Sequence, residues 1–216
     1  MGLKVAKVVK VNPSEPEEEA VALATEVIKT GGLVALPTET VYGLAADFKN
    51  ESAVRRVFFV KRRPLNLGLI VGVRSILDIY SLAAEVPPQA LRLFRLFSPG
   101  PLTGVFKRKD FLLPILSGNT DGIAIRIPRS KIAIRIMEKS GTFVTLTSAN
   151  RHQRRSPQTA EEVERDIGEE IDLILDGGKT EIGKESTIID FTQIPPKILR
   201  EGAIPWREIK RYLRVD

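Results

Sequence analysis

Five short polar segments of this sequence carry the side chains best suited to chemistry. They are Pro-Thr-Glu-Thr-Val-Tyr-Gly (37–43), Lys-Arg-Arg-Pro (61–64), Ser-Pro-Gly-Pro-Leu-Thr (98–103), Thr-Ser-Ala-Asn (147–150) and Gly-Lys-Glu-Ser-Thr (183–187). Each lies where an apolar stretch ends, which is where the backbone leaves the core and side chains can converge on a ligand. We therefore expect one binding site that draws on several of these segments.

The second segment supplies two cations suited to phosphate. Lys61 ends an expected helix, and Arg63 precedes Pro64, which favours an extended backbone with alternate side chains on the same face. We expect Lys61 and Arg63 to point the same way, because a lysine charge beside an arginine fork suits a polyphosphate. The alternative is that Lys61 caps the helix and the arginines are solvated.

The fourth segment follows an expected strand and ends in Ser148 and Asn150. The same two-residue period puts these hydroxyl and amide groups on one face, with Ala149 turned inward. An ordinary polar turn would use the same residue types. The pattern indicates a second polar wall of the site without identifying its ligand.

Several kinds of site are excluded by residues that the sequence lacks. It has no cysteine and one histidine, His152, so thiol nucleophiles, thiolate metal sites and paired imidazoles are excluded, and we predict no protein metal centre. We expect His152 to be a surface loop residue, because no carboxylate near it in the sequence could orient it for catalysis. Gly178-Lys179-Thr180 resembles the end of a Walker A loop, but Leu173 stands where its first glycine is needed. No Gly-x-Gly-x-x-Gly follows a strand, so the dinucleotide fingerprint is absent as well.

Composition favours a globular chain with anionic partners. Its 216 residues, 43% of them hydrophobic, suffice for one core, so we expect a single domain over 1–216 with a short basic tail at about 205–216. Basic residues outnumber acidic ones by 33 to 27, with clusters at 107–109, at 151–155 and in the tail. Nucleotides, tRNA or an anionic surface would fit this charge, although a solvated face is an equally common reason for such clusters. No apolar stretch approaches ~18 residues and no secretory segment opens the chain, so we expect a cytoplasmic protein without membrane contact.

Apolar periodicity and turn residues predict an alternation of helices and strands. The expected helices begin at a capping box at Ser14, at Ser52, at Pro88, at Lys131 and at a capping box at Thr159. The expected strands span 33–36, 67–73, 123–127, 143–146, 171–175, 186–190 and 197–199, and the tail is helix-like. This alternation is typical of the α/β class.

Together the segments resemble the YrdC family of threonylcarbamoyl-AMP synthases. The resemblance extends from Thr38 to Gly202 and includes Leu-Val-Ala-Leu-Pro-Thr-Glu-Thr-Val-Tyr-Gly, Lys-Arg-Arg-Pro, Ile-Ala-Ile-Arg-Ile-Pro, Thr-Ser-Ala-Asn, Leu-Asp-Gly-Gly, Gly-Lys-Glu-Ser-Thr and Leu-Arg-Glu-Gly-Ala-Ile. It implies a single-domain YrdC-like α/β fold, with a twisted mixed sheet flanked by helices around a large basic cavity. The implied reaction converts L-threonine, bicarbonate and ATP, with Mg²⁺, to threonylcarbamoyl-AMP and pyrophosphate. A separate transferase complex would then pass the threonylcarbamoyl group to an adenosine of tRNA.

The resemblance also implies a role for each matching residue. It assigns catalysis and ATP binding to Lys61, Arg63, Ser148 and Asn150, with Ser156 and Arg200 completing the nucleotide site. It assigns threonine binding to Thr38, Arg126 and Ser186. The chemistry agrees, because Arg126 can grip a carboxylate with two hydrogen bonds and the hydroxyls can read a small polar substrate.

The loop after Asn150 departs most from the family pattern. It reads Arg151-His152-Gln153-Arg154-Arg155, where many relatives have a Ser-Gly turn. We expect its arginines to raise the positive potential at the cavity mouth, where the loop would either close over the triphosphate or remain a mobile solvated segment.

Two other functions compete with the synthase. One is a non-catalytic RNA-binding YrdC-like module with direct tRNA contact. The basic clusters permit this function, but an aromatic content of 6% provides few side chains on which bases could stack. The other is a carbamoyl-adenylate-forming domain with a different acceptor, as in hydrogenase-maturation proteins, but the zinc-finger-like cysteines found there are missing here.

Overall fold

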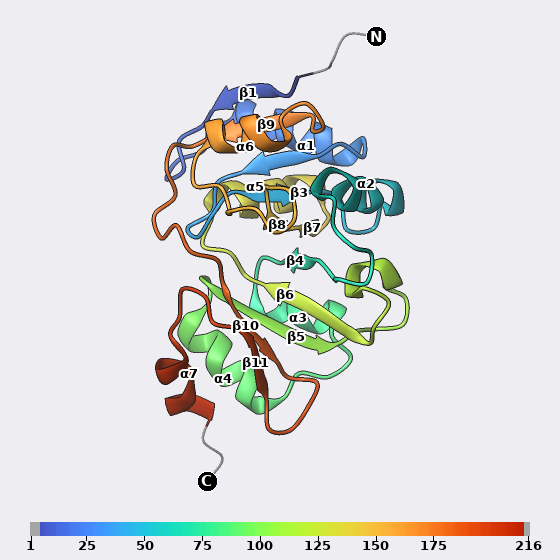
Figure 1. Ribbon diagram of the computed structural model, residues 1–216, viewed down its shortest axis with the longest axis vertical. Helices are drawn as coiled ribbons and strands as arrows, with labels where there is room; N and C mark the ends of the chain where they lie inside the picture. The colour runs from blue at the N-terminus through green and yellow to red at the C-terminus, as the bar shows by residue number, and fades with distance from the viewer. Residues whose placement is uncertain (1–4, 214–216) are drawn as a thin grey trace.

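The computed structural model describes residues 5–213, in which helices and strands alternate along the chain (Figure 1). The α-helices are α1 (Glu18–Lys29), α2 (Glu51–Lys61), α3 (Ile76–Leu82), α4 (Pro88–Phe97), α5 (Lys131–Ser140), α6 (Ala160–Ile167) and α7 (Trp206–Leu213), with a 3₁₀ turn at Pro114–Ser117. The strands are β1 (Lys7–Lys10), β2 (Val34–Leu36), β3 (Gly43–Ala45), β4 (Ile70–Gly72), β5 (Leu102–Lys107), β6 (Gly122–Arg126), β7 (Val144–Thr145), β8 (Thr147–Ser148), β9 (Leu173–Asp176), β10 (Thr187–Asp190) and β11 (Lys197–Arg200). The α/β prediction is confirmed.

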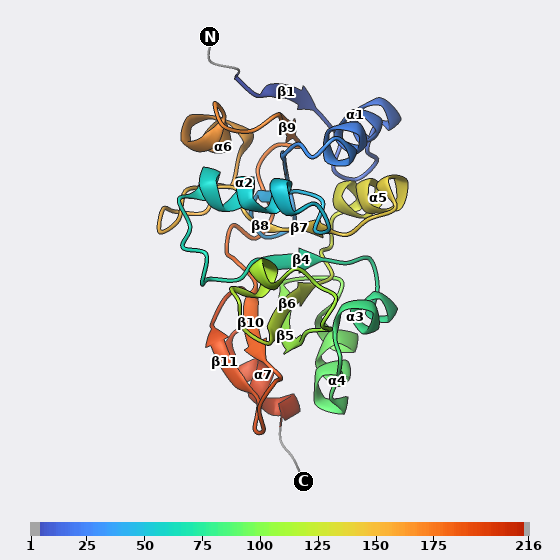
Figure 2. The ribbon, with the colours of Figure 1, turned by 90° about the vertical axis from the view of Figure 1, so that its right-hand side faces the viewer.

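The first sheet is five-stranded, in the order β1-β9-β2-β3-β8, with helices on both faces. Its strands β2 and β9 are short, fully buried and parallel, as expected for strands covered on two sides. Figure 2 shows α1 and α5 on one face and α2 and α6 on the other. The apolar stripe of α1, including Ala24 and Ile28, packs with Ile136 and Met137 of α5 against the sheet.

The second sheet is six-stranded, in the order β11-β10-β5-β6-β4-β7, and lies below the first in Figure 1. It is mixed, because β10 pairs with β5 in parallel whereas β5 and β6 are antiparallel. Helix α4 contributes Leu93 and Phe94 to the core, and its Phe97 meets Tyr212 of α7 edge to face at 5.8 Å. The C-terminal helix therefore closes this end of the molecule.

The two sheets meet at the segment 144–148. On one side the Thr145 amide donates to the Ala46 carbonyl (2.9 Å), and β8 continues into pairing with β3. On the other side β7 pairs with β4, and the Leu146 amide donates to the Ile70 carbonyl (2.7 Å). One short stretch of backbone thus belongs to both sheets, and the Thr-Ser-Ala-Asn segment leaves it at the junction.

Local signals predicted some element ends correctly and others not. Helix α4 spans the predicted residues from Pro88 to Phe97, and Thr159 caps α6 by accepting the Glu162 amide. The capping box at Ser14 was a wrong prediction: α1 begins at Glu18 without a side-chain cap. The reason is local competition, because the Asn12 side chain accepts the amides of Ser14 and Glu15 while Glu17 accepts the Asn12 amide.

The sequence analysis did not predict five elements, namely β1, β3, β5, β8 and α3, nor the 3₁₀ turn at Pro114–Ser117. Strand β3 begins at Gly43, the last residue of a polar segment. Strand β5 contains Gly104, whose added Cβ would lie 2.7 Å from the Phe106 ring. The predicted basic tail forms α7 as far as residue 213, whereas Arg214 lies outside the described residues. Within the described range, every helix is too short or too polar to cross a membrane.

Candidate active site

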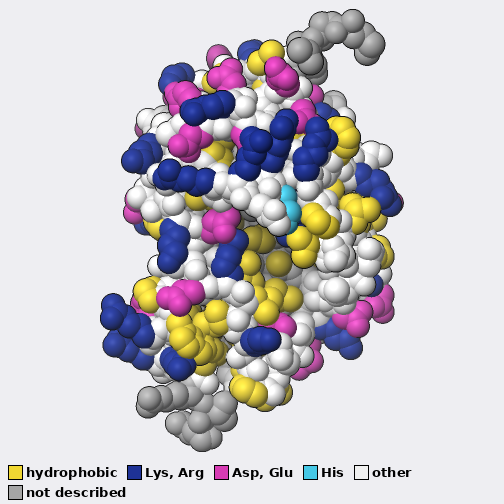
Figure 3. All heavy atoms as spheres, in the orientation of Figure 1, with side chains coloured by type: hydrophobic (Ala, Val, Ile, Leu, Met, Phe, Trp, Pro, Cys, Tyr) yellow, Lys and Arg dark blue, Asp and Glu magenta, His cyan; other side chains and the backbone are white. Residues whose placement is uncertain are grey.

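A cavity of about 460 Å³ opens at the junction of the two sheets. Figure 3 shows it as a hollow with an apolar floor and Lys and Arg side chains on its rim. Eight of the nine predicted site residues line it: Thr38, Lys61, Arg63, Arg126, Ser148, Asn150, Ser186 and Arg200. Segments that are far apart in the sequence therefore converge, as the sequence predicted, although convergence alone does not assign their roles.

Lys61 is the most constrained cation of the cavity. It is the last residue of α2 and is buried, and its Nζ donates to the Ser148 carbonyl, the Asn150 carbonyl (2.7 Å) and Asn150 Oδ1 (3.3 Å). Burial lowers its pKa to about 7, and the positive charge of Arg63 adds to this effect. An anion in the cavity would restore the charged form, so this lysine is poised to respond to a negatively charged ligand.

Two further arginines line the cavity, Arg63 next to Lys61 and Arg200 next to Ser186. Arg63 is held in place by backbone, with Nε donating to the Leu67 carbonyl (2.9 Å) and Nη2 to the Gly68 carbonyl (2.7 Å). Burial lowers the pKa of both Arg63 and Arg200, and the positive charge of Arg200 lowers that of Arg63 further. The two positive charges therefore repel one another, and an anion bound between them would relieve that repulsion.

The predicted groups reach the cavity by a different local geometry from the one expected. Arg62 is left-handed (φ 51°, ψ 38°), so Lys61 ends a helix and the two side chains converge across a turn. Similarly, the Asn150 amide donates to the Ser148 carbonyl (3.0 Å), a tight turn that an extended strand would not form. The predicted two-residue alternation therefore does not explain why these side chains meet, although Lys61, Arg63, Ser148 and Asn150 all line the cavity.

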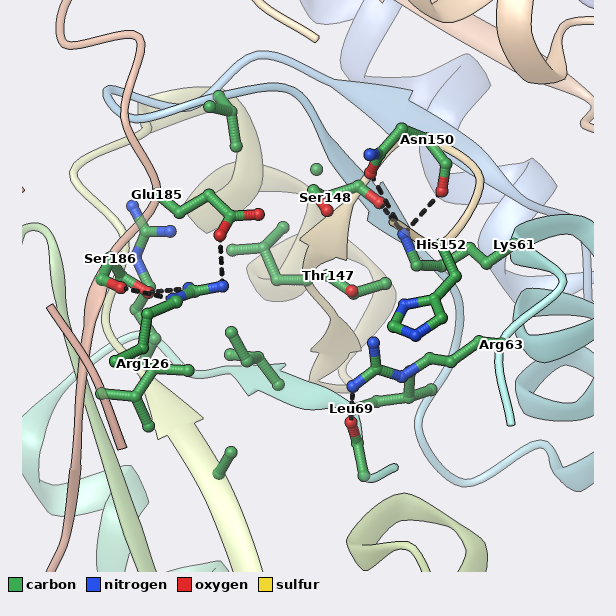
Figure 4. A pocket seen from close by; sticks show the side chains of 18 of the residues that line it. Lys61, Arg63, Leu69, Arg126, Thr147, Ser148, Asn150, His152, Glu185 and Ser186 are labelled. Atoms are coloured by element: carbon green, nitrogen blue, oxygen red, sulfur yellow. Dashed lines mark hydrogen bonds and ion pairs between the residues drawn. The ribbon is translucent and has the colours of Figure 1, made fainter. Parts of the chain in front are cut away.

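Arg126 lies across the cavity from Lys61 (Figure 4) and is neutralised by Glu39. Its Nη2 lies 2.8 Å from Glu39 Oε1 and also donates to Thr40 Oγ1, while Nε donates to the Gly100 carbonyl. Both partners of the ion pair are almost fully buried, with side chains 4% and 2% exposed. Within residues 5–213, Arg126 Nη1 has no hydrogen-bond partner, so this nitrogen is the one left for a ligand.

Hydroxyl groups accompany Arg126 on this side. Thr38 is buried and its hydroxyl donates to the Val41 carbonyl (2.7 Å). The hydroxyls of Ser186 and Thr103 form a hydrogen bond with each other (2.8 Å). Arg200 reaches Ser186 from β11, with Nε donating to its carbonyl (3.1 Å) and Nη2 to its hydroxyl (3.3 Å). The predicted threonine and nucleotide residues therefore touch each other at Ser186 and Arg200.

Ser156 is the one predicted residue that does not line the cavity. Its hydroxyl donates to Glu185 Oε1 (2.6 Å), and the other oxygen of Glu185 forms an ion pair with Arg200. Ser156 can therefore act on the cavity only through Glu185. The sequence analysis missed Glu39 and Glu185, although each lies inside one of the five polar segments. For Glu39 the available signal was Arg126, because a buried arginine requires a carboxylate partner.

The loop 151–155 is anchored to α6 and to the turn that follows it. Arg151 pairs with Glu170 (2.8 Å), and Arg154 pairs with Asp166. His152 is a partly exposed loop residue, as predicted, and it also lines the cavity, where Figure 4 shows it beside Arg63. The reason is that its backbone amide donates to the Lys61 carbonyl (2.6 Å), which folds the loop inward.

A dedicated metal centre does not fit this cavity. Residues 5–213 contain no group of three or more Asp, Glu, His or Cys side chains placed to hold a metal. Glu185 is the one carboxylate among the cavity's lining residues in this range. The donor set therefore fits Mg²⁺ only as an ion carried in by phosphate oxygens, which is its usual mode of binding.

Comparisons with known proteins match this chain over most of its length. The Sua5/YciO/YrdC family model, described as telomere recombination, matches residues 26–202. A threonylcarbamoyl-AMP synthase of Pyrococcus abyssi is 41% identical over 91% of this chain and 58% of its own length, and one of Bacillus subtilis is 37% identical over 89% and 56%. The chain thus spans less than six-tenths of these two relatives. A crystal structure of Pyrococcus abyssi Sua5 complexed with L-threonine superposes with a TM-score of 0.92, at 39% identity over 96% of this chain and 61% of that one.

Proposed function

This chain belongs to the Sua5/YciO/YrdC family, and we propose that it is a threonylcarbamoyl-AMP synthase. It would join L-threonine, bicarbonate and ATP into threonylcarbamoyl-AMP and pyrophosphate. The observation that carries the proposal is the convergence of Lys61, Arg63 and Arg200 on one cavity that Arg126 and Ser186 also line. The likeness to a relative solved with L-threonine supports the amino-acid substrate.

The cationic wall would bind the triphosphate of ATP. Lys61 and Arg63 are held by backbone carbonyls, which fix their direction without supplying a negative charge. A triphosphate would relieve the repulsion between Arg63 and Arg200 and return the proton to Lys61. Ser148 and Asn150 line the same wall, and we assign them to the nucleotide as well.

The opposite wall would bind threonine. The Nη1 group of Arg126 can donate hydrogen bonds to the substrate carboxylate, while the ion pair with Glu39 fixes the orientation of the guanidinium. Thr38 and Ser186 lie on the same side of the cavity with hydroxyls that suit a small polar substrate.

Catalysis would rest on alignment rather than on a covalent intermediate. The threonine amine and bicarbonate give a carbamate and a water molecule, and a carbamate oxygen then attacks the α-phosphorus of ATP and displaces pyrophosphate. The protein brings two anions together, excludes water and stabilises charge on the leaving group with Lys61, Arg63 and Arg200. Bound Mg²⁺ would supply further neutralisation of the phosphate oxygens.

Downstream steps involve partners that we also assign by proposal. Threonylcarbamoyl-AMP is a mixed anhydride, so an acyl-transferring partner complex must consume it, with tRNA adenosine as the acceptor. Direct tRNA contact with this chain is the alternative use of the basic clusters at 107–109 and 151–155.

The test of the proposed function is a direct assay. Purified protein is incubated with ATP, Mg²⁺, threonine and bicarbonate, and pyrophosphate is measured together with the adenylate product. We expect release that requires all three substrates. RNA binding with steep salt dependence and no pyrophosphate would overturn the proposal in favour of a non-catalytic module.

A further inference from the structure

Glu185 stands out as a carboxylate inside a cationic cavity. It is the one acidic residue among the described lining residues, in a cavity that Lys61, Arg63, Arg126, Arg154 and Arg200 also line. Its side chain is 33% exposed, so it faces the open space of the cavity. Figure 4 shows it beside Ser186, on the side of the cavity opposite Lys61.

The contacts of Glu185 link it to the nucleotide residues. One carboxylate oxygen accepts the Ser156 hydroxyl (2.6 Å), and the other pairs with Arg200 Nη1. The negative charge of Glu185 also favours the protonated forms of Lys61, Arg63 and Arg200. It therefore lies electrostatically within reach of every cation that we assign to the triphosphate.

This placement has opposite consequences for two forms of a nucleotide. A free triphosphate brings its full negative charge towards Glu185, and the carboxylate repels it. A triphosphate that carries Mg²⁺ presents less negative charge together with a hard cation that prefers carboxylate oxygens. The same residue thus penalises one form and favours the other.

We propose that Glu185 makes this site selective for metal-bound over free nucleoside triphosphate. The inference rests on the proposed function, since it takes ATP as the ligand of the Lys61 and Arg63 wall. Glu185 sets the preference by its charge in the cavity, while its bonds to Ser156 and Arg200 fix where that charge lies. A carboxylate whose role was only to tether Ser156 and Arg200 would affect both nucleotide forms equally.

The experiment measures ATP affinity by calorimetry, once with excess Mg²⁺ and once with EDTA, in the absence of threonine. The variant is Glu185→Gln, which keeps an acceptor for Ser156 and removes the charge. The matched control is Glu181→Gln in the same connecting segment, because Glu181 is 66% exposed, pairs with Arg129 and does not line the cavity. Both variants lose one negative charge, so a long-range effect on net charge would appear in both.

We expect Glu185→Gln to bind free ATP about tenfold more tightly, the size of one removed charge repulsion at short range. Its affinity for Mg²⁺-bound ATP should stay equal or fall, so the ratio of the two dissociation constants shrinks about tenfold or more. Glu181→Gln should keep the wild-type ratio. Glu185→Asp, which keeps the charge, should also retain most of the preference and guards against a variant that simply misfolds.

A ratio unchanged in Glu185→Gln, or changed equally in Glu181→Gln, overturns the inference. If Glu185→Gln weakened the binding of both nucleotide forms equally, Glu185 would only hold Ser156 and Arg200 in place, and the inference would be overturned as well. These outcomes are separate from failure of the proposed function, which would appear as wild-type protein that binds ATP in neither condition.

Discussion

The two walls of the cavity hold their cations in opposite ways. Arg126 is buried beside Glu39, and both oxygens of that carboxylate are used, by Arg126 and by the Arg129 amide (3.1 Å). Lys61 and Arg63, by contrast, are held by backbone carbonyls that orient them without cancelling their charge. One wall is neutral and rigid, whereas the other keeps an excess of positive charge.

This difference matches the ligands that we assign to the walls. A compensated arginine can direct one remaining nitrogen at a small carboxylate with little change in charge. For a pair of cations without a neighbouring negative charge, the favourable electrostatic energy of binding is greatest when the ligand is a strongly charged anion. The neutral wall should therefore matter chiefly for folding and substrate orientation, and the charged wall chiefly for nucleotide affinity.

The largest effect should follow from breaking the neutral wall. We expect Glu39→Ala to lower the free energy of unfolding by about 3–5 kcal/mol, because it leaves Arg126 charged and buried without a partner. Urea denaturation followed by circular dichroism measures the loss. Glu185→Ala is the control on the charged side, where a half-exposed ion pair should contribute less than about 1 kcal/mol. Equal losses in the two variants would contradict the comparison.

Breaking the charged wall should abolish activity and leave most of the stability. We expect Arg63→Ala to reduce pyrophosphate release about a hundredfold, because the leaving group loses its electrostatic stabilisation. Lys61→Ala should do the same, but it should also cost about 1–3 kcal/mol of stability, since the Ser148 and Asn150 carbonyls lose their buried donor. Near-normal turnover in either variant would remove the phosphate role assigned to that residue.

The sequence predicted which residues line the cavity better than it predicted the contacts between them. Helix α4 from Pro88 and the cap at Thr159 were predictable, because their signals lie within a few residues of each other. The Arg126–Glu39 pair joins residues 87 positions apart, and no local pattern encodes it. Predicting this pair would have required knowing that Arg126 of β6 is buried, because a buried guanidinium requires a carboxylate partner and an exposed one does not.

A smaller effect should separate the two walls by ligand. We expect Arg126→Lys to weaken threonine binding about tenfold and to leave ATP binding nearly unchanged, because lysine keeps the charge for Glu39 and loses the planar fork. Calorimetry with each ligand measures the two affinities. Equal losses for threonine and ATP would show that the walls do not act separately.

The charged wall should also give ATP affinity a dependence on pH. The pKa of Lys61 lies near 7 in the folded protein, so its ammonium form falls from about half at pH 7 to about a tenth at pH 8. We expect ATP affinity to fall about fivefold over that interval, with proton uptake on binding that calorimetry in two buffers reveals. The groups that act on Lys61 are Arg63, Glu185 and Asp166. Lys61→Met should bind more weakly throughout and lose both the pH dependence and the proton uptake.

The smallest effect concerns the loop 151–155, which borders the charged wall. Its anchors to Asp166 and Glu170 hold it in place before any nucleotide arrives, so its arginines should act through their charge without a closing movement. We expect replacement of Arg151, Arg154 and Arg155 by serine to raise the KM for ATP about threefold and to make it less sensitive to salt, with threonine affinity unchanged. Steady-state kinetics at two ionic strengths measures both. If the triple variant keeps its ATP kinetics and loses affinity for tRNA instead, this loop belongs to a nucleic-acid surface and the charged wall ends at Lys61 and Arg63.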